Sequence, residues 1–490
     1  MAEADFTPAT VTNDKFCELV GRDVWPVFHS PRLPEEPAAQ LAGYRYTYNG
    51  DTTLAYYQKN WYRWAGTHWD RVDEDDVRAD LRKTLAMAAV IDKDGNKKPW
   101  PVNRRNIGEL IDALKALVNV PSTNDTPCWL TPRNGDPSPA RLLFLQNKIV
   151  DVDTRATYDP TPRVFNMAAA ACSYDPRATC PTWRKFLTDS FADDPKAVEF
   201  LQQWFGYVLS GDTSLQKAAL LTGATRAGKG LITGVLTALV GEANCASVQL
   251  GALAGEFGME DLLGKKLAIV GDARSTSKAA QKAAETLLNI TGEDSVGVNR
   301  KGIKVRTVRL GARVMMSSNE TPRIFDAAGA LPGRFVCAHM PISHLGREDP
   351  DLERRLHAEL PGILNWALDG YDHLRKQGRF TEPDATAEVQ DIMKELGSPV
   401  AGFVKDCCTV TGDHGDYVRQ TDLGAAYRTW CANNGLKASN LTVLRSELKS
   451  VAPTVAYRDK PPAGETGTRW YHGVQLTKTA GDLRLEGLQS

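Results

Sequence analysis

The 490-residue chain lacks long apolar runs, and this absence limits where it can reside. A bilayer-spanning helix needs about 20 consecutive apolar residues. The longest apolar stretches, at residues 85–91 and 167–172, are far shorter. The N-terminal residues contain early acids and no apolar core, so no secretory signal is expected. We therefore expect a cytoplasmic protein with no membrane partner.

Paired cysteines and a net charge are also missing. The nine cysteines include no C-x-x-C motif. An odd, unpatterned set in a long chain is typical of a reducing compartment. A zinc site built from Cys172, Cys180 and a distant histidine is a minor alternative. Lys and Arg number 59 against 60 Asp and Glu, so any surface that binds nucleic acid must be local.

What is present is an ordinary globular composition, with 42% hydrophobic and 24% charged residues. At roughly 150 residues per domain, the length suggests about three domains. Between residues 216 and 340, apolar strand-like runs alternate with helical segments, which predicts an α/β core. We expect six segments: a polar arm (1–40), a mixed α+β region (41–165), a helical collar (166–215), the α/β core (216–385), a compact C-terminal unit (399–478) and a tail (479–490).

Two features of the N-terminal half have both structural and functional interpretations. Residues 61–69 contain three tryptophans and predict two short strands around Gly66. Together with Arg63 they are able to stack nucleic-acid bases, although a small β-layer that packs its own core is favoured. Asp151 and Asp153 form a D-x-D pair after a predicted strand. Such a pair can hold divalent metals, but without a third carboxylate nearby a turn role is favoured.

The most informative segment is a glycine-rich loop between a predicted strand (218–221) and a predicted helix (231–239). Gly223 and Gly228 allow backbone conformations that turn N–H groups inward as an anion nest. The helix N-terminus adds partial positive charge, and Lys229 is placed to reach the β- and γ-phosphates of a nucleotide. The predicted nucleotide-binding residues are Gly223, Ala224, Thr225, Arg226, Ala227, Gly228, Lys229, Gly230 and Leu231.

The loop departs from the usual pattern at one position. The residue after the lysine is commonly Ser or Thr, whose hydroxyl binds Mg²⁺, but here it is Gly230. Thr233 is the nearest downstream hydroxyl. Asp272 follows a predicted strand (266–271) and is the candidate Mg²⁺ ligand, with a helix-capping role as the alternative. No second acid follows Asp272, so the general base stays open.

Two further polar residues follow predicted strands or turns. Asn319 comes after the strand at 312–316 and is placed to orient the attacking water, or is an ordinary loop residue. Arg334 follows a Pro-Gly turn, where it is either a surface residue or an arginine that reaches the nucleotide of a neighbouring copy. The second role works only across a subunit interface, and it therefore predicts a heterologous ring.

Residues 295–319 contain six basic side chains and no acid, and part of this window predicts a β-hairpin. Basic residues on a hairpin suit contacts with the phosphates of a nucleic-acid strand. The alternative is a solvated hairpin, which explains the absence of carboxylates less well. The predicted DNA-binding residues are Arg300, Lys301, Lys304 and Arg306.

The order of these segments resembles a known family. GATRAGKG, KKLAIVGDAR, LLNITGEDSVGVNRKG, ARVMMSSNETPRIFDAAGALPGRF and GREDPDLERRLHAELPGILNWALDGYDHL follow one another as in superfamily 3 helicases. More narrowly, they resemble the helicase module of phage and plasmid primase–helicases, with poxvirus-type relatives. The resemblance makes residues 41–165 a pre-helicase region. It implies an AAA+ P-loop ATPase core in a hexameric ring that uses ATP and Mg²⁺ to move along single-stranded DNA.

Carried onto this chain, the resemblance makes Lys229 part of motif A, Asp272 motif B, Asn319 motif C and Arg334 the arginine finger. It also implies a forked duplex as substrate and a replication partner such as a primase or polymerase, in a prokaryotic or phage-infected cytoplasm. The first 40 residues are too few for a priming domain, so priming is not expected. Two alternatives stay open: a non-translocating origin-loading scaffold, favoured by Gly230, and a primase acting through Asp151 and Asp153.

The C-terminal unit has the pattern of a winged helix. Three predicted helices are followed by two strand-like segments, at 454–458 and 469–476. Arg445 and Lys449 lie one turn apart on the third helix. Contact with duplex DNA and docking to a protein are equally favoured.

Overall fold

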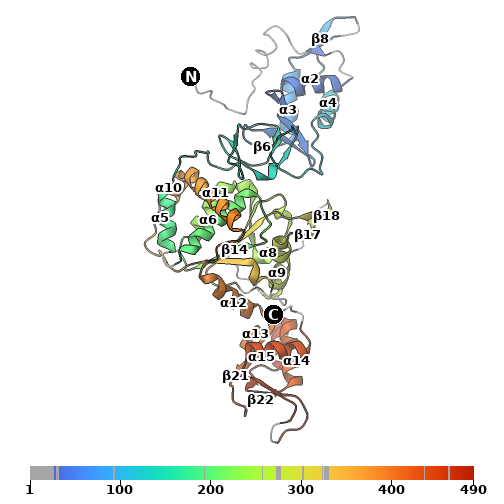
Figure 1. Ribbon diagram of the computed structural model, residues 1–490. Coiled ribbons are helices and arrows are strands. Elements are labelled where there is room, and N and C mark those ends of the chain that lie inside the picture. Colours follow the sequence, from blue (N-terminus) through green and yellow to red (C-terminus); the bar gives the residue numbers. More distant parts are fainter. Residues whose placement is uncertain are drawn as a thin grey trace.

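The computed structural model (Figure 1) describes residues 27–28, 33–91, 94–191, 194–255, 258–271, 277–300, 303–322, 324, 330–434, 436, 438–461 and 464–489. Three lobes follow one another along its long axis in chain order. We call them the N-terminal lobe (27–175), the middle lobe (181–378) and the C-terminal lobe (385–489).

Three helices form the outer part of the N-terminal lobe. The longest begins after Asn103, whose side chain accepts a hydrogen bond from the backbone N–H of Asn106 at 2.9 Å. Its apolar residues recur at helical spacing and are buried from Ile107 to Leu114, as predicted, whereas Leu117 is 52% exposed. The helices are α2 (Glu35–Tyr44), α3 (Glu74–Leu85) and α4 (Arg104–Leu117).

The tryptophan-rich segment forms an antiparallel sheet of β4 (Leu54–Tyr57), β5 (Asn60–Trp64) and β6 (Trp69–Val72), as predicted. Trp61 and Trp69 are 2% and 1% exposed. The ring of Tyr62 meets that of Phe165 edge-on at 5.3 Å. These rings are core residues, so they are not a platform for stacking bases.

The remaining strands of this lobe are short. A hairpin turns near residue 146, where Leu142 pairs with Asp151 across an antiparallel ladder. The strands are β1 (Val27–Phe28), β2 (Thr47–Tyr48), β3 (Asp51–Thr52), β7 (Ala89–Ile91), β8 (Lys97–Pro99), β9 (Cys128–Trp129), β10 (Leu142–Phe144), β11 (Ile149–Asp151), β12 (Thr157–Tyr158) and β13 (Val164–Phe165).

A five-stranded parallel sheet is the centre of the middle lobe, which confirms the α/β class. Its order is β15-β16-β19-β14-β20. The strand that leads into the glycine loop therefore lies between β19 and β20, and β16 lies one strand further away. The strands are β14 (Ala218–Gly223), β15 (Cys245–Gln249), β16 (Leu267–Gly271), β19 (Arg313–Ser318) and β20 (Phe335–Met340).

Helices pack around this sheet, and two of them touch closely. A Cβ added to Gly206 of α6 would lie 2.3 Å from the carbonyl oxygen of Ala367 of α11, so only glycine allows this approach. The helices are α5 (Pro181–Ser190), α6 (Pro195–Ser210), α7 (Lys229–Val240), α8 (Leu250–Leu253), α9 (Ser277–Gly292), α10 (Leu352–Ala358) and α11 (Leu360–Gln377).

The basic window forms an antiparallel hairpin of β17 (Ser295–Arg300) and β18 (Ile303–Arg309). It lies at the side of the middle lobe, to the right in Figure 1. Short 3-10 turns join other elements: η1 (Pro139–Arg141), η2 (Glu242–Asn244), η3 (Glu260–Leu262) and η4 (Pro332–Arg334).

The C-terminal lobe has its own apolar core. Asn440 caps α15, as predicted, by accepting hydrogen bonds from the backbone N–H groups of Thr442 and Val443. The segment treated as a tail forms α16, which buries Leu483 in this core. The elements are α12 (Ala385–Gly397), α13 (Pro399–Cys407), α14 (Gln420–Asn433), α15 (Leu441–Val451), α16 (Ala480–Gln489), β21 (Cys408–Val410), β22 (Tyr417–Arg419), β23 (Ala456–Arg458), β24 (Trp470–His472) and β25 (Val474–Leu476).

Across the described ranges, no helix combines the length and the apolar character that crossing a membrane requires. The cysteines in those ranges are unpaired, and Cys172 and Cys180 are both buried. Burial raises the pKa of Cys172 to about 12, so its thiol stays protonated at neutral pH. The described residues contain no group of three or more His, Cys, Asp or Glu residues arranged to hold a metal.

Candidate nucleotide-binding site

The glycine loop follows β14, a strand whose six residues are all buried. Gly223 has φ +145°, and a Cβ there would lie 2.2 Å from the carbonyl oxygen of Met340. Gly228 has φ +96°, and a Cβ there would lie 2.8 Å from the ring of Phe186. Both positions therefore require glycine, for conformation and for space. The loop ends as α7 begins at Lys229, so the helix N-terminus points at it.

Lys229 lies inside this loop. Its side chain is largely buried, and Nζ donates hydrogen bonds to the carbonyl oxygens of Gly223 at 2.8 Å and Ala224 at 2.7 Å. Burial lowers the pKa of its ammonium group. A bound anion would offset this desolvation, because a nearby negative charge favours the protonated amine.

The loop opens on a cavity of about 690 Å³, a size typical of small-molecule sites. Four segments line it. The first comes from the glycine loop and α7: Arg226, Ala227, Gly228, Lys229, Gly230 and Leu231. The second is Ser317 and Asn319 after β19. The third belongs to α5: Thr182, Lys185, Phe186, Asp189 and Ser190. The fourth belongs to α10 and the segment before it: His344, Arg347, Glu348, Asp349, Leu352 and Arg355.

The charges that line the cavity are unbalanced. Five Lys and Arg residues face three carboxylates. Lys185 pairs with Asp189 at 2.9 Å, and Arg355 pairs with Asp349. The excess of positive charge focuses attraction on anions that enter the cavity. This charge, with the N-terminus of α7 at the end of the loop, fits the phosphates of a nucleotide.

The α5 wall is held in place by Glu359, which lies between α10 and α11. The carboxylate of Glu359 accepts hydrogen bonds at 3.0 Å from the backbone N–H groups of both Thr182 and Trp183. It thereby satisfies two donors that the first turn of α5 would leave free. Sequence reasoning did not assign α5 or α10 to the site, because they lie far from the glycine loop along the chain. The dense charges at residues 347–355 are the only local signal of such a role.

The segment after β20 fastens the glycine loop. The hydroxyl of Ser343 donates a hydrogen bond to the carbonyl oxygen of Thr225 at 2.8 Å. The backbone N–H of His344 donates to the carbonyl oxygen of Arg226 at 3.1 Å. These bonds help to hold Arg226 at a positive φ of 61°.

The predicted Asn319 lines the cavity, and so does Ser317, which pairs in register with Leu221 of β14 and with Gly271 of β16. Asp272 follows Gly271 directly but lies outside the described residues. Thr233 does not line the cavity, because its hydroxyl donates a hydrogen bond to the carbonyl oxygen of Gly230 at 3.0 Å. Ser317 is therefore a cavity hydroxyl that the sequence analysis did not assign as a Mg²⁺ ligand.

Arg334 lies away from this cavity. It directly precedes β20, at the amino ends of the parallel strands, whereas Gly223 ends β14 at their carboxyl ends. Six residues of strand separate the two edges, about 20 Å at roughly 3.3 Å per residue. The Arg334 guanidinium is half-buried and donates to the side-chain oxygen of Gln216 at 2.6 Å. It is therefore too far away to reach a nucleotide held by its own chain.

Of the predicted DNA-binding residues, Arg300 ends β17, and Lys304 and Arg306 lie in β18. Lys301 lies outside the described residues. Arg313, which belongs to the same basic window, has another role. It is 5% exposed, donates to the carbonyl oxygen of Asp212 at 2.8 Å and has its pKa lowered to about 10 by burial. It is a core residue that is not accessible to a nucleic acid.

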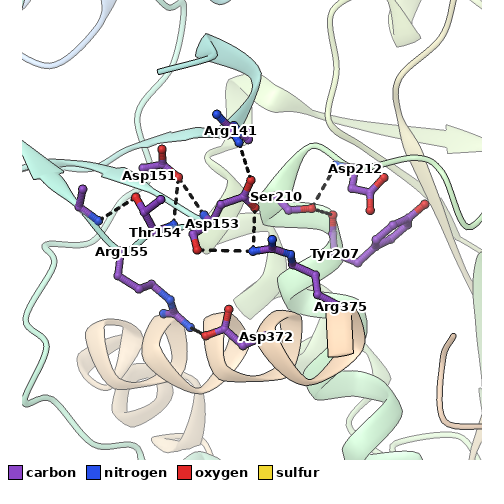
Figure 2. Close-up of polar contacts among 11 residues, drawn as sticks. Arg141, Asp151, Asp153, Thr154, Arg155, Tyr207, Ser210, Asp212, Asp372 and Arg375 are labelled. Carbon is purple, nitrogen blue, oxygen red and sulfur yellow. Dashed lines mark hydrogen bonds and ion pairs between the residues drawn. The ribbon is translucent and has the colours of Figure 1, made fainter. Parts of the chain in front are cut away.

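Figure 2 shows that Asp151 and Asp153 are engaged by their own chain. A carboxylate oxygen of Asp151 accepts the N–H groups of Asp153 at 2.9 Å and Thr154 at 3.2 Å. The Asp153 carboxylate pairs with Arg141 at 2.8 Å and Arg375 at 3.4 Å. The turn role is confirmed, and the pair has no free oxygen cluster that suits catalytic metals.

In the C-terminal lobe, the predicted basic residue Arg445 is exposed and packs against an aromatic ring of the same lobe. Its guanidinium lies 3.6 Å from the ring centroid of Tyr457, and this cation–π contact links α15 to β23. Arg419 lies over Trp470 at 4.9 Å in the same way.

Two family models match separate parts of the chain. Residues 42–192 match the family described as D5 N terminal like. Residues 221–331 match a family of unknown function, DUF5906. No curated protein matches this sequence.

Three solved structures that are similar to this chain are apo forms of the C-terminal region of NrS-1. Their TM-scores are 0.45, 0.42 and 0.43, at 12%, 12% and 13% identity. Each similarity covers 86% of this chain and 96% of the other chain.

Proposed function

We propose that this protein is an ATP-dependent DNA helicase of phage- or plasmid-type replication, with a superfamily 3 AAA+ core. The observation that carries the proposal is the cavity at the glycine loop, where Lys229 is buried against loop carbonyls and cationic side chains are in excess. The match of residues 42–192 to the D5 N terminal like family supports a primase–helicase relationship.

In this proposal the polar groups at the cavity, together with Asp272 after β16, divide the tasks of ATP hydrolysis. Lys229 and the loop N–H groups hold the β- and γ-phosphates. Asn319 orients the attacking water from the end of β19. Asp272 and Ser317 would hold Mg²⁺, which supplies charge neutralisation on the phosphates. The cavity walls from α5 and α10 exclude water from the rest of the nucleotide.

The position of Arg334 supports an assembly. Because the arginine lies at the opposite edge of the sheet from its own cavity, any contact it makes with a nucleotide is with that of another copy. Contacts of this head-to-tail kind form a closed ring when the rotation between neighbouring copies closes on itself. We propose a homo-hexamer, as the resemblance to superfamily 3 implies, with an arginine finger at each interface.

The hairpin β17–β18 is the proposed contact with single-stranded DNA, through Arg300, Lys301, Lys304 and Arg306. Basic groups along a hairpin bind the phosphate backbone without reading sequence. The C-terminal lobe is the proposed winged-helix domain, which would contact duplex DNA or a replication partner such as a primase or polymerase.

A strand-displacement assay on a forked duplex tests the proposal. The wild-type protein should displace the strand when ATP and Mg²⁺ are present, and Lys229→Ala should not. Lys196→Ala is the matched control, because that lysine is exposed and pairs with Asp384 outside the cavity. ATP-independent displacement, or displacement by Lys229→Ala at the wild-type rate, would contradict the proposal.

One observation favours a second candidate, a scaffold that loads at an origin and uses ATP only to assemble. Gly230 replaces the usual Mg²⁺-binding hydroxyl, and the Thr233 hydroxyl is bonded to its own helix. The same assay separates the two functions. A wild-type protein that assembles on DNA and hydrolyses ATP without displacing a strand is the loading scaffold.

A further inference from the structure

The side-chain amide of Gln216 joins two parts of the middle lobe that the proposed function uses separately. Its oxygen accepts a hydrogen bond from Nη1 of Arg334 at 2.6 Å. Its nitrogen donates a hydrogen bond to the carbonyl oxygen of Gly292 at 3.2 Å. Gly292 ends α9, three residues before β17 begins at Ser295. One amide therefore bridges Arg334 and the base of the basic hairpin.

Neighbouring bonds keep this bridge in one geometry. Nζ of Lys217 donates to the carbonyl oxygen of Gly333 at 2.7 Å, which holds the backbone next to Arg334. The hydroxyl of Thr213 donates to the carboxylate of Glu293, which holds the turn before the hairpin. Gln216 and Glu293 both have positive φ, of 52° and 60°. Non-glycine residues keep that conformation only where the surroundings enforce it.

We infer that Gln216 is a positioning residue that couples the DNA-contacting hairpin of one copy to the arginine that this copy presents to its neighbour's nucleotide. The inference rests on the proposed function. The amide uses opposite ends for its two partners, so a shift of the hairpin base moves the oxygen that orients the guanidinium. DNA bound at β17–β18 thereby changes the geometry of Arg334, and hydrolysis in the next copy responds to DNA.

Two substitutions separate the two halves of the bridge. Gln216→Leu has a similar size and removes both hydrogen bonds. We expect it to lower kcat for ATP hydrolysis with single-stranded DNA about tenfold, because small misplacements of a catalytic group have effects of this size or larger. The KM for ATP should change less than about twofold, since the nucleotide is bound by another copy's loop.

Gln216→Glu keeps an acceptor for Arg334 but replaces the donor to Gly292 by a repelling oxygen. We expect it to retain more DNA-free hydrolysis than Gln216→Leu and to lose most of the stimulation by DNA. Gln390→Leu is the matched control. Gln390 donates to the carbonyl oxygen of Phe335, the residue after Arg334, at 2.8 Å. Its loss should leave the stimulation by DNA unchanged.

Mixing of variant subunits tests whether Gln216 acts on a neighbouring copy. Lys229→Ala subunits have an intact Gln216–Arg334 bridge, and Gln216→Leu subunits have an intact glycine loop. A mixture should regain hydrolysis, because some interfaces then combine an intact loop with an intact bridge. The mixture of Lys229→Ala with Arg334→Ala is the reference, and it should regain hydrolysis in the same way.

Each outcome decides the inference. Rescue of both mixtures, with lost DNA stimulation in Gln216→Glu, supports it. Rescue of the reference mixture alone shows that Gln216 only stabilises its own subunit, which overturns the inference and leaves the proposed function intact. Unchanged DNA stimulation in Gln216→Leu also overturns it. If the wild-type protein hydrolyses no ATP, the proposed function is contradicted, and so is the inference that rests on it.

Discussion

The glycine-loop cavity and the Asp153 cluster of Figure 2 are both charged sites that follow β-strands, yet their charges are satisfied in opposite ways. In the cluster, Asp153 is paired with Arg141 and Arg375 of the same chain. In the cavity, Lys229 is bonded to carbonyl oxygens, and cations exceed carboxylates. The charges of the cluster are paired within the chain, whereas the cavity keeps an excess of positive charge that a bound anion would balance.

The comparison shows that a sequence motif indicates a chemical function only where the fold leaves its charged groups unpaired within the chain. The D-x-D pair and the glycine loop are both known ways to manage phosphate chemistry. Burial with internal ion pairs makes the first a structural element. An open cavity with positive excess makes the second a candidate site.

The largest effect that separates the two sites is expected from Lys229→Ala. Loss of the ammonium group should lower ATP hydrolysis by about 10³-fold or more, because the phosphates lose their buried positive partner. Hydrolysis is measured by phosphate release, with thermal unfolding as the check on folding. If the variant hydrolysed ATP at a rate within tenfold of the wild-type rate, the cavity would be no more an active site than the Asp153 cluster is.

Arg334→Ala sharpens the comparison, because this arginine is satisfied by its own chain and is nevertheless expected to be catalytic. Its loss should lower kcat by about 10³-fold, the lower end for an arginine finger, with little change in KM for ATP. Arg334→Lys should recover little, since an ammonium group lacks the planar fork of donors. If both variants kept the wild-type kcat, Arg334 would be a structural residue like Arg313.

Ser317→Ala tests the hydroxyl that sequence reasoning left unassigned. We expect about a tenfold increase in the Mg²⁺ concentration needed for half-maximal hydrolysis, if Ser317 supplies the ligand that Gly230 lacks. Ser318→Ala is the control, because Ser318 is the next residue and does not line the cavity. An equal response of the two variants to Mg²⁺ would exclude Ser317 as a ligand.

Asp153→Asn should have the smallest effect on activity and a clear effect on stability. Removing the charge of Asp153, whose side chain is 15% exposed, leaves Arg141 and Arg375 without their partner. Because both arginines are partly solvated, we expect a cost of about 1–2 kcal/mol in unfolding free energy. ATP hydrolysis should be unchanged. Asp159→Asn is the matched control at an exposed pair with Lys148 and should cost less than about 1 kcal/mol. Loss of hydrolysis without loss of stability would reinstate Asp153 as an active-site residue.

The sequence predicted those features whose cause is local. The Asn440 cap, the turn at Gly66 and the strand, loop and helix around Lys229 were all predictable, because each depends on neighbours within a few residues. Helical spacing of apolar residues continues in the sequence from residue 76 to residue 90, but α3 ends at Leu85, because Ala89 pairs with Val27 of β1. Tertiary strand pairing there overrides helical periodicity.

What the sequence did not reveal depends on segments that are distant along the chain. The α5 and α10 walls of the cavity come from either side of the glycine loop, and only the fold brings Phe186 and Leu352 to Lys229. In the sequence, Arg313 is one more basic residue of the window predicted to bind DNA. In the structure it is buried beside Tyr207 and Asp212. The bridge formed by Gln216 has no sequence signature, because a lone glutamine carries no pattern.

The dependence of ATP hydrolysis on assembly tests the central claim most directly. The account places the nucleotide at the carboxyl edge of one sheet and completes its site with Arg334 from another copy. Hydrolysis per chain, measured over a dilution series together with particle mass, should fall steeply as assemblies dissociate into single chains. A constant rate per chain down to isolated monomers would contradict the account.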